Sequence, residues 1–258
     1  MILKILAGIL IVFFFLLAVL WVYHTIMLKR EHITNPPPGK IYEISGDRIH
    51  LYTEGSGNVV LVFLAGSGTS SPVLDFKVLY EQLTNNYTIA VPERPGYGWS
   101  AKGNSPRDIA TLIQQNRDVL SQAGFTPPYV LTAHSMGALE ALSWAALYPD
   151  EVTAVIGLDP AVPDAYSYMK LPGRFLQSLL YFGARIGITR IIPGICSPKL
   201  PKTIDMDAYC AMIHKNTLTS DMIKEIRNVL ENARYTADLG VPKVPLLFFD
   251  SGGAAVGV

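Results

Sequence analysis

One serine stands between small residues at the point where an apolar, β-branched stretch gives way to a helical pattern. The sequence there reads A-H-S-M-G, from Ala133 to Gly137, with Ser135 at its centre. Small residues two positions before and after the serine relieve crowding between a strand and a following helix. A sharp turn of this kind pushes the serine hydroxyl above the sheet, near a helix N-terminus that stabilises negative charge. The pattern predicts a nucleophilic serine.

Two alternatives accompany this hypothesis. Ser135 would be a simple helix N-cap if the turn were relaxed. His134 lies next to it in the sequence, but adjacent side chains on such a turn point apart. We therefore expect His134 to pack or to line the wall of a site rather than to act as the base for Ser135.

A second segment could supply the hydrogen-bond donors that acyl transfer needs. The sequence L-A-G-S-G at 64–68 follows an apolar stretch, and its glycines allow the backbone to approach a substrate oxygen closely. We expect the donors of an oxyanion hole to be the backbone N–H groups of Ser67 and Met136. The alternative is a plain Gly/Ser turn.

The elements that must position these residues alternate between strand and helix. Helical patterns include 136–147, which is apolar on nearly all sides, and one that we expect to begin at a capping box, Ser105-Pro106-Arg107-Asp108. Predicted strands lie at 41–44, 48–53, 58–64, 87–91, 129–132, 152–158 and 244–249. The alternation predicts an α/β fold with a mostly parallel, twisted sheet and helices on both faces. Such sheets bind ligands at the carboxyl ends of their strands.

The N-terminus predicts a membrane anchor. Residues 5–23 are apolar without a charge, are bracketed by Lys4 and Lys29-Arg30, and carry Trp21 and Tyr23 near one end. A helix needs about 20 such residues to cross a bilayer. A cleaved signal peptide and a core helix are the alternatives. We expect a single-pass protein of the cell membrane and a polyproline spacer at 35–39. The charges on either side of the apolar stretch do not decide which side of the membrane the rest of the chain lies on.

Composition excludes several classes of protein. Lys+Arg and Asp+Glu both total 21, so no basic excess favours a nucleic-acid partner. Half of the residues are hydrophobic, which excludes disorder. The two cysteines, Cys196 and Cys210, exclude a disulfide scaffold and a four-cysteine zinc site, and whether they pair stays open. We expect no cofactor and no metal, and a small molecule as the substrate.

Together these motifs resemble the α/β-hydrolase superfamily. The matching stretches are L-A-G-S-G at 64–68, E-R-P-G-Y-G-W-S at 93–100, A-H-S-M-G at 133–137 and G-L-D-P at 157–160. The resemblance implies a serine hydrolase that cleaves an ester, or an amide, of a moderately apolar molecule. Ala65 stands where many members carry His, which we expect to alter the bracing of the loop. Serine rather than aspartate at 135 argues against epoxide hydrolase chemistry.

The resemblance also implies a division of the chain. Residues 1–30 would be the anchor, 31–40 a Pro-rich linker and 41–160 the hydrolase core. Residues 161–240 resemble the helical cap of esterases, epoxide hydrolases and proline-iminopeptidase-like enzymes. Residues 241–258 would hold the penultimate core strand and a truncated end.

The expected truncation follows from the missing base. The family's triad runs Ser, Asp or Glu, then His, and the acid here would be Asp250 or Asp159. No histidine follows His214, which falls in a predicted helix at 206–215 and is expected to pack or to face solvent. A serine without a base is a poor nucleophile. The alternatives are a proline-releasing aminopeptidase and an inactive pseudo-hydrolase that binds rather than cleaves.

Overall fold

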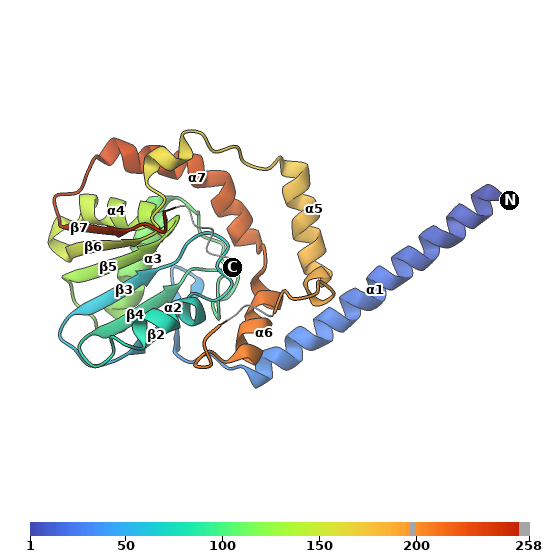
Figure 1. Ribbon diagram of the computed structural model, residues 1–258, viewed down its shortest axis with the longest axis horizontal. Coiled ribbons are helices and arrows are strands. Elements are labelled where there is room, and N and C mark those ends of the chain that lie inside the picture. Colours follow the sequence, from blue (N-terminus) through green and yellow to red (C-terminus); the bar gives the residue numbers. More distant parts are fainter. Residues whose placement is uncertain (197–199, 253–258) are drawn as a thin grey trace.

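A single seven-stranded sheet with helices on both faces forms the body of the molecule in the computed structural model (Figure 1). The structure describes residues 1–196 and 200–252. The strand order is β1-β2-β4-β3-β5-β6-β7, with β1 and β2 antiparallel to their neighbours and β3 to β7 parallel. The prediction of an α/β fold with a mostly parallel sheet is therefore confirmed.

The strands lie close to their predicted positions. They are β1 (Lys40–Ile44), β2 (Asp47–Glu54), β3 (Val60–Leu64), β4 (Thr88–Glu93), β5 (Tyr129–His134), β6 (Val152–Leu158) and β7 (Leu246–Phe249). All five side chains of β3 are buried, as expected for a strand covered on both faces. β7 pairs with β6 at one end of the sheet, and its four side chains are exposed.

Alternate residues of the strands enter two apolar clusters on opposite faces. Leu64, Leu131 and Ala133 pack on one face, where the helices are α3 (Ile109–Gln122), α4 (Gly137–Leu147) and α7 (Ser220–Leu239). Phe63 and Val91 pack on the other, against α2 (Pro72–Tyr80) and α6 (Met206–Asn216). The two clusters fix the sheet between its helices, which holds the strand ends in place.

The start of α3 differs from the prediction. Asp108, not Ser105, is the N-cap, and its carboxylate accepts a hydrogen bond from the N–H of Thr111 at 2.9 Å. The N–H groups of Asn104 and Ser105 instead donate to the buried carboxylate of Asp47. This tertiary contact keeps the segment before Asp108 out of the helix.

The N-terminal helix α1 (Ile2–Thr34) is long and apolar enough to span a membrane, and its most apolar stretch buries none of its surface in the protein. It continues into the range assigned to the Pro-rich linker. Its last turns contact the body: His24 is buried, and Glu31 forms an ion pair with Arg190 at 2.7 Å. The remainder projects away from the body (Figure 1).

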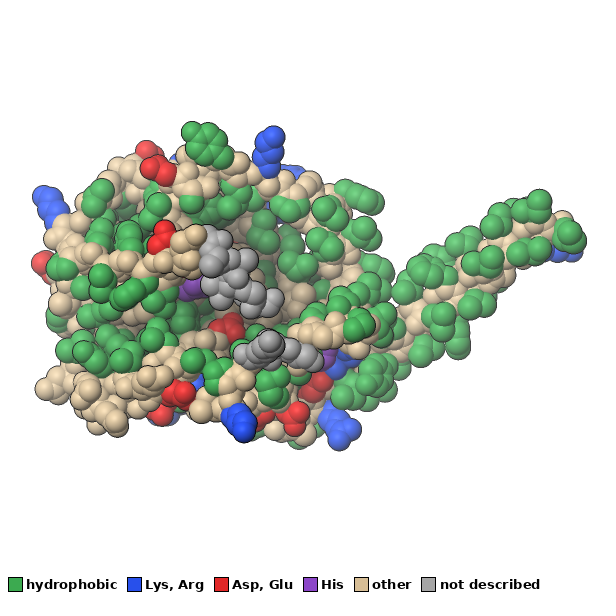
Figure 2. Space-filling view, viewed as in Figure 1, with side chains coloured by type: hydrophobic (Ala, Val, Ile, Leu, Met, Phe, Trp, Pro, Cys, Tyr) green, Lys and Arg blue, Asp and Glu red, His purple; other side chains and the backbone are tan. Residues whose placement is uncertain are grey.

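The segment between β6 and β7 is helical. It contains α5 (Arg174–Arg185), α6 and α7, together with the short 3₁₀ helices η2 (Pro163–Tyr166) and η3 (Ile188–Arg190). The carboxyl ends of the central strands face the space that these helices surround (Figure 1). Figure 2 shows that the face of the molecule is hollowed there.

Candidate functional site

Ser135 occupies a strained turn between β5 and α4. Its φ angle is 48°, in the left-handed region that a residue with a side chain rarely adopts. Two backbone N–H groups, of Ala138 and Ala161, both donate to its carbonyl oxygen at 3.0 Å. These bonds offset the strain and hold the turn, while the serine itself stays half-buried.

The small residues around Ser135 have a steric cause. A Cβ on Gly137 would lie 2.5 Å from the carbonyl oxygen of Leu64 and 2.8 Å from that of Ala65, so only glycine fits. Ala133 is fully buried in the cluster beneath the turn. A Cβ on Gly66 would lie 3.0 Å from the Cβ of Ser135. The loop after β3 therefore lies directly against the turn that carries the serine.

The two N–H groups expected to form an oxyanion hole lie on these adjoining segments. Ser67 is exposed in the loop after β3, and it precedes Gly68, whose φ is 77°. Met136 is buried at the N-cap of α4. Within residues 1–196 and 200–252, no group accepts a hydrogen bond from either N–H. Both donors are thus available next to Ser135.

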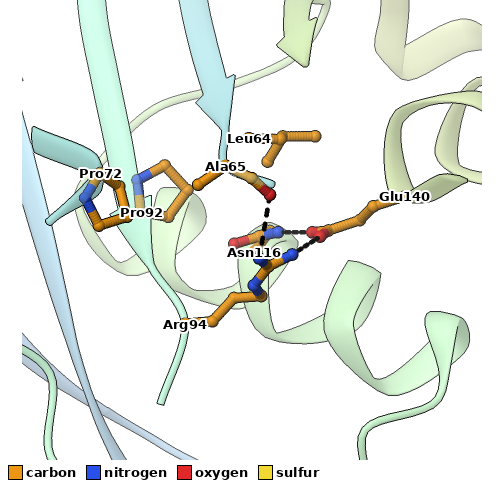
Figure 3. Close-up of a pocket in the computed structure, with 7 residues that line it drawn as sticks. All are labelled: Leu64, Ala65, Pro72, Pro92, Arg94, Asn116 and Glu140. Carbon is orange, nitrogen blue, oxygen red and sulfur yellow. Dashed lines mark hydrogen bonds and ion pairs between the residues drawn. The ribbon is translucent and has the colours of Figure 1, made fainter. Parts of the chain in front are cut away.

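Arg94 braces the loop that holds Ser67, a role that the sequence analysis missed. It follows β4 directly, and its Nη2 donates to the carbonyl oxygens of Ala65 at 2.9 Å and Gly66 at 3.0 Å. Figure 3 shows the guanidinium beneath the loop, with Glu140 and Asn116 beside it. The gap around these groups has no room for a water molecule. A lone arginine within a Pro- and Gly-rich turn was the available signal.

Two buried carboxylates hold Arg94 in turn. Glu140 of α4 accepts from its Nη1 at 3.2 Å, and Glu225 of α7 lies 3.4 Å from its Nε. Arg107 and the hydroxyl of Tyr97 also bind Glu225. Burial disfavours the charged guanidinium, but Glu225 and Glu140 hold the pKa of Arg94 above its usual value. The network links the loop at Gly66 to both α4 and α7.

The two candidate acids lie at the ends of adjacent strands. Asp159 follows β6 with a φ of 48°, and its carboxylate accepts from the hydroxyl of Ser251 at 3.0 Å. Asp250 follows β7 and accepts from the N–H of Gly252 at 2.8 Å. Both are exposed. Neither donates to or accepts from Ser135 among the described residues.

His134, next to Ser135, and His214, on α6, lie in different environments. Burial lowers the pKa of His134, and the charge of Asp159 opposes that shift, so His134 and Asp159 lie near each other. A Cβ on Gly66 would lie 3.1 Å from Nδ1 of His134, which places this ring beside the loop after β3. His214 is buried in α6 and hydrogen-bonded to Thr189 at 3.0 Å, so it packs as expected.

Two further features lie apart from the turn. Cys196 and Cys210 are both free thiols, half-buried in the helical segment. A cavity of about 200 Å³ opens between η2 and α7, but neither the turn at Ser135 nor the loop at Ser67 lines it. The described residues hold no cluster of His, Cys, Asp or Glu that could bind a metal ion.

Comparison with known proteins agrees with this geometry. A family model described as alpha/beta hydrolase fold matches residues 59–188. The uncharacterized protein YbdG of Bacillus subtilis (strain 168) is 32% identical over 240 residues, which cover 90% of this chain and 74% of that protein. YqjL of the same organism is 31% identical over 140 residues, covering 54% of each chain.

Solved structures share the architecture. Cfl2 from Burkholderia cenocepacia matches with a TM-score of 0.62 at 21% identity, over 81% of this chain and 78% of that one. The epoxide hydrolase VrEH1 from Vigna radiata matches with a TM-score of 0.58 at 21% identity, over 81% and 77% of the two chains. At this identity the likeness concerns the fold.

Proposed function

The chain belongs to the alpha/beta hydrolase fold family, and from that premise we propose that it is a membrane-anchored serine hydrolase. Its reaction would be the cleavage of an ester bond in a small molecule through an acyl-enzyme on Ser135. The observation that carries the proposal is the φ angle of 48° at Ser135. A mere N-cap gains nothing from such strain, whereas a nucleophile gains exposure above the strand ends.

The chemistry follows from the neighbours of Ser135. Its Oγ attacks the carbonyl carbon of the ester as a base takes the hydroxyl proton, and the oxygen of the tetrahedral intermediate becomes negative. The N–H groups of Ser67 and Met136 donate to this oxyanion. Collapse expels the alcohol, which takes up a proton, and water then releases the acid from Ser135. Each oxyanion donor contributes about 2.7–4 kcal/mol to such a reaction.

Asp159 is the acid that we prefer over Asp250. It follows β6, the strand that pairs with β5 and its Ser135, and a hydrogen bond from the hydroxyl of Ser251 at 3.0 Å fixes its carboxylate. The carboxylate of Asp250 is engaged instead by the N–H of Gly252, two residues ahead. An acid that orients a base beside Ser135 must lie on the Ser135 side of the sheet, which favours the end of β6, the strand next to β5.

A second candidate function, a pseudo-hydrolase that binds without cleaving, rests on one specific observation. Within residues 1–196 and 200–252, no histidine is hydrogen-bonded to Ser135, and His214 is engaged by Thr189. A serine hydroxyl without a base reacts slowly. This candidate keeps the hollow and the strained turn as a binding site.

The membrane anchor is supported by the way α1 meets the body. No residue in the most apolar stretch of α1 is buried in the protein, which argues against a core helix. The turns that follow it pack on the cap, where Arg190 donates to both carboxylate oxygens of Glu31 at 2.7 Å.

Ester hydrolysis by the detergent-solubilised chain tests the proposal. We expect p-nitrophenyl esters of short and medium acyl chains to be hydrolysed, and Ser135→Ala to remove the activity. Ser121→Ala, an exposed serine on α3, is the matched control and retains the activity. Equal rates for the Ser135→Ala and parent proteins would exclude the acyl-enzyme. Binding of an ester without turnover would favour the pseudo-hydrolase.

A further inference from the structure

Helix α5 is amphipathic, but its apolar side faces outward. We define the α5 apolar surface as the five exposed side chains Phe175, Leu176, Leu179, Leu180 and Phe182. Their positions in the sequence place them on one broad side of the helix. Phe175 is 83% exposed and Leu179 is 54% exposed. A helix on the surface of a soluble domain buries this side.

The polar side of α5 makes the contacts with the body. Gln177 is buried, accepts from Nε of Arg227 at 2.9 Å and donates to the carbonyl oxygen of Pro172 at 2.7 Å. Arg185 donates to the carbonyl oxygens of Lys215 and Thr217 at 3.1 and 2.6 Å. These bonds fix the rotation of α5 about its axis. The hydrogen bonds of its polar side therefore hold the apolar side of α5 outward.

The α5 apolar surface continues to the point where α1 leaves the body. Ile188, Ile191 and Ile192, which follow α5, are also exposed. Between them, Arg190 binds His24 and Glu31 of α1, and a Cβ on Gly187 would lie 2.6 Å from the Cβ of His24. His24 follows directly after the apolar stretch 5–23. Apolar side chains line both α1 and the neighbouring edge of the body (Figure 2).

The segment that contains α5 is rich in basic residues, although Arg190 is neutralised by its ion pair with Glu31 of α1. Residues 165–204 contain six lysines or arginines and no aspartate or glutamate, although the chain as a whole has no net charge. Lys170 and Arg174, near the start of α5, are exposed. Exposed apolar side chains next to basic ones are the combination that binds an anionic bilayer surface.

We propose that the α5 apolar surface lies in the interface of the bilayer that α1 crosses. The inference rests on the membrane anchor of the proposed function, and it adds a substrate class to it. The contact of His24 with Gly187 sets the C-terminal end of α5 at the level where the apolar part of α1 ends. The helices around the hollow then touch lipid, and an ester dissolved in the bilayer reaches Ser135 without crossing water.

Tryptophan quenching by brominated lipids tests the contact directly. The full chain, reconstituted in phosphatidylcholine vesicles with phosphatidylglycerol, carries Phe175→Trp or Leu179→Trp. Val241→Trp is the matched control, because Val241 is 81% exposed on the loop between α7 and β7. We subtract the fluorescence of the parent protein from that of each variant. Brominated lipid should then quench the tryptophan fluorescence contributed by Phe175→Trp or Leu179→Trp, and leave that contributed by Val241→Trp unchanged.

Each other outcome overturns the inference. If Trp21 of α1 is quenched and the tryptophan at 175 is not, the anchor stands and the docking of α5 is wrong. If a second copy covers Phe175, chemical crosslinks between chains that carry Phe175→Cys will appear instead of quenching. A chain that does not float with vesicles lacks both the anchor and the docking. Labelling of Ser135 by a phosphonate in the same vesicles reports separately on the hydrolase.

A rate ratio tests the substrate class. The double change Phe175→Glu and Leu179→Glu places acidic groups on the α5 apolar surface, facing anionic lipid. The ratio of the rate on a long-chain ester held in vesicles to that on a soluble short-chain ester should fall at least several-fold. An unchanged ratio would contradict the delivery of substrate from the bilayer, even where quenching is seen.

Discussion

Arg94 donates a hydrogen bond to the carbonyl oxygen of Gly66 at 3.0 Å, so a buried cation holds the loop that lies against Ser135. The same Nη2 also binds the carbonyl oxygen of Ala65. The two bonds orient the peptide groups on either side of Gly66, and the N–H of Ser67 belongs to the second of these groups. The position of one expected oxyanion donor is therefore set by the side chain of Arg94.

Arg94→Lys separates this positioning from stability. Lysine keeps the positive charge between Glu140 and Glu225, but its single Nζ cannot serve the two carbonyls and both carboxylates at once. We expect a phosphonate to label Ser135 at least 10-fold more slowly, whereas Arg94→Ala should also lower the free energy of unfolding by about 3–5 kcal/mol because it leaves buried carboxylates unpaired. Labelling kinetics and denaturant unfolding measure the two effects.

Arg117→Lys is the control for Arg94→Lys, because Arg117 pairs with Glu151 at the surface. It should label at the parent rate. An Arg94→Lys protein that labels as fast as the parent would show that the loop does not depend on Arg94.

Gly137→Ala should damage the turn at Ser135. Its Cβ would meet backbone oxygen atoms of Leu64 and Ala65 at 2.5 and 2.8 Å, and neither can move without shifting β3. We expect a loss of about 1–3 kcal/mol in unfolding free energy, as in other overpacked sites, together with a loss of Ser135 labelling. Gly173→Ala, where the added Cβ meets nothing within 4 Å, is the matched control. Equal stability of the two variants would contradict the close packing.

Protonation of Asp47 in acid should lower the stability of the protein. Its buried carboxylate accepts bonds from Asn104, Ser105 and Gln115. Burial opposes its ionisation, but these bonds hold the pKa of Asp47 below its usual value. A lowered folded-state pKa gives stability that is complete above the unfolded value of about 3.9 and is lost as the pH falls through the folded value.

Asp47→Asn removes this dependence on pH. We expect it to lower the unfolding free energy by about 1–3 kcal/mol at pH 7, and by less at a pH below the lowered pKa of Asp47. Denaturant unfolding at the two pH values checks this. The same difference between variant and parent at both values would contradict the role of ionised Asp47.

The choice of acid is tested by two amide variants. Asp159→Asn should slow the labelling of Ser135 by a larger factor than Asp250→Asn, because Asp159 follows β6, the strand that pairs with β5 and its Ser135. Both aspartates are exposed, so both variants should unfold like the parent. A larger loss in Asp250→Asn would assign the acid to the end of β7.

The sequence predicted the features that depend on local pattern. The turn at Ser135 was predicted because its small residues, strand and helix are contiguous, and the strand positions because buried strands are apolar throughout. The predicted start of α3 was wrong, because the hydrogen bonds from Asn104 and Ser105 to Asp47 outweigh the local capping signal. Ser105 and Asp47 are far apart in the sequence, so the pattern of neighbouring residues could not predict that contact.

The buried ion network was beyond the sequence for the same reason. Arg94 lies in the turn after β4, Glu140 on α4 and Glu225 on α7. In the sequence alone, each has the pattern of an ordinary surface charge. The expectation that Ala65 changes the bracing of its loop was made from the resemblance. Arg94 supplies a brace there, bound to the carbonyl oxygen of Ala65 itself.

Covalent trapping of Ser135 tests the central claim most directly. The full chain in detergent is treated with a fluorophosphonate, and the modified peptide is identified by mass spectrometry. We expect one adduct on the peptide that contains Ser135, and no adduct in the Ser135→Ala protein. An unmodified Ser135 in a folded chain, or an adduct that persists in Ser135→Ala, would contradict it.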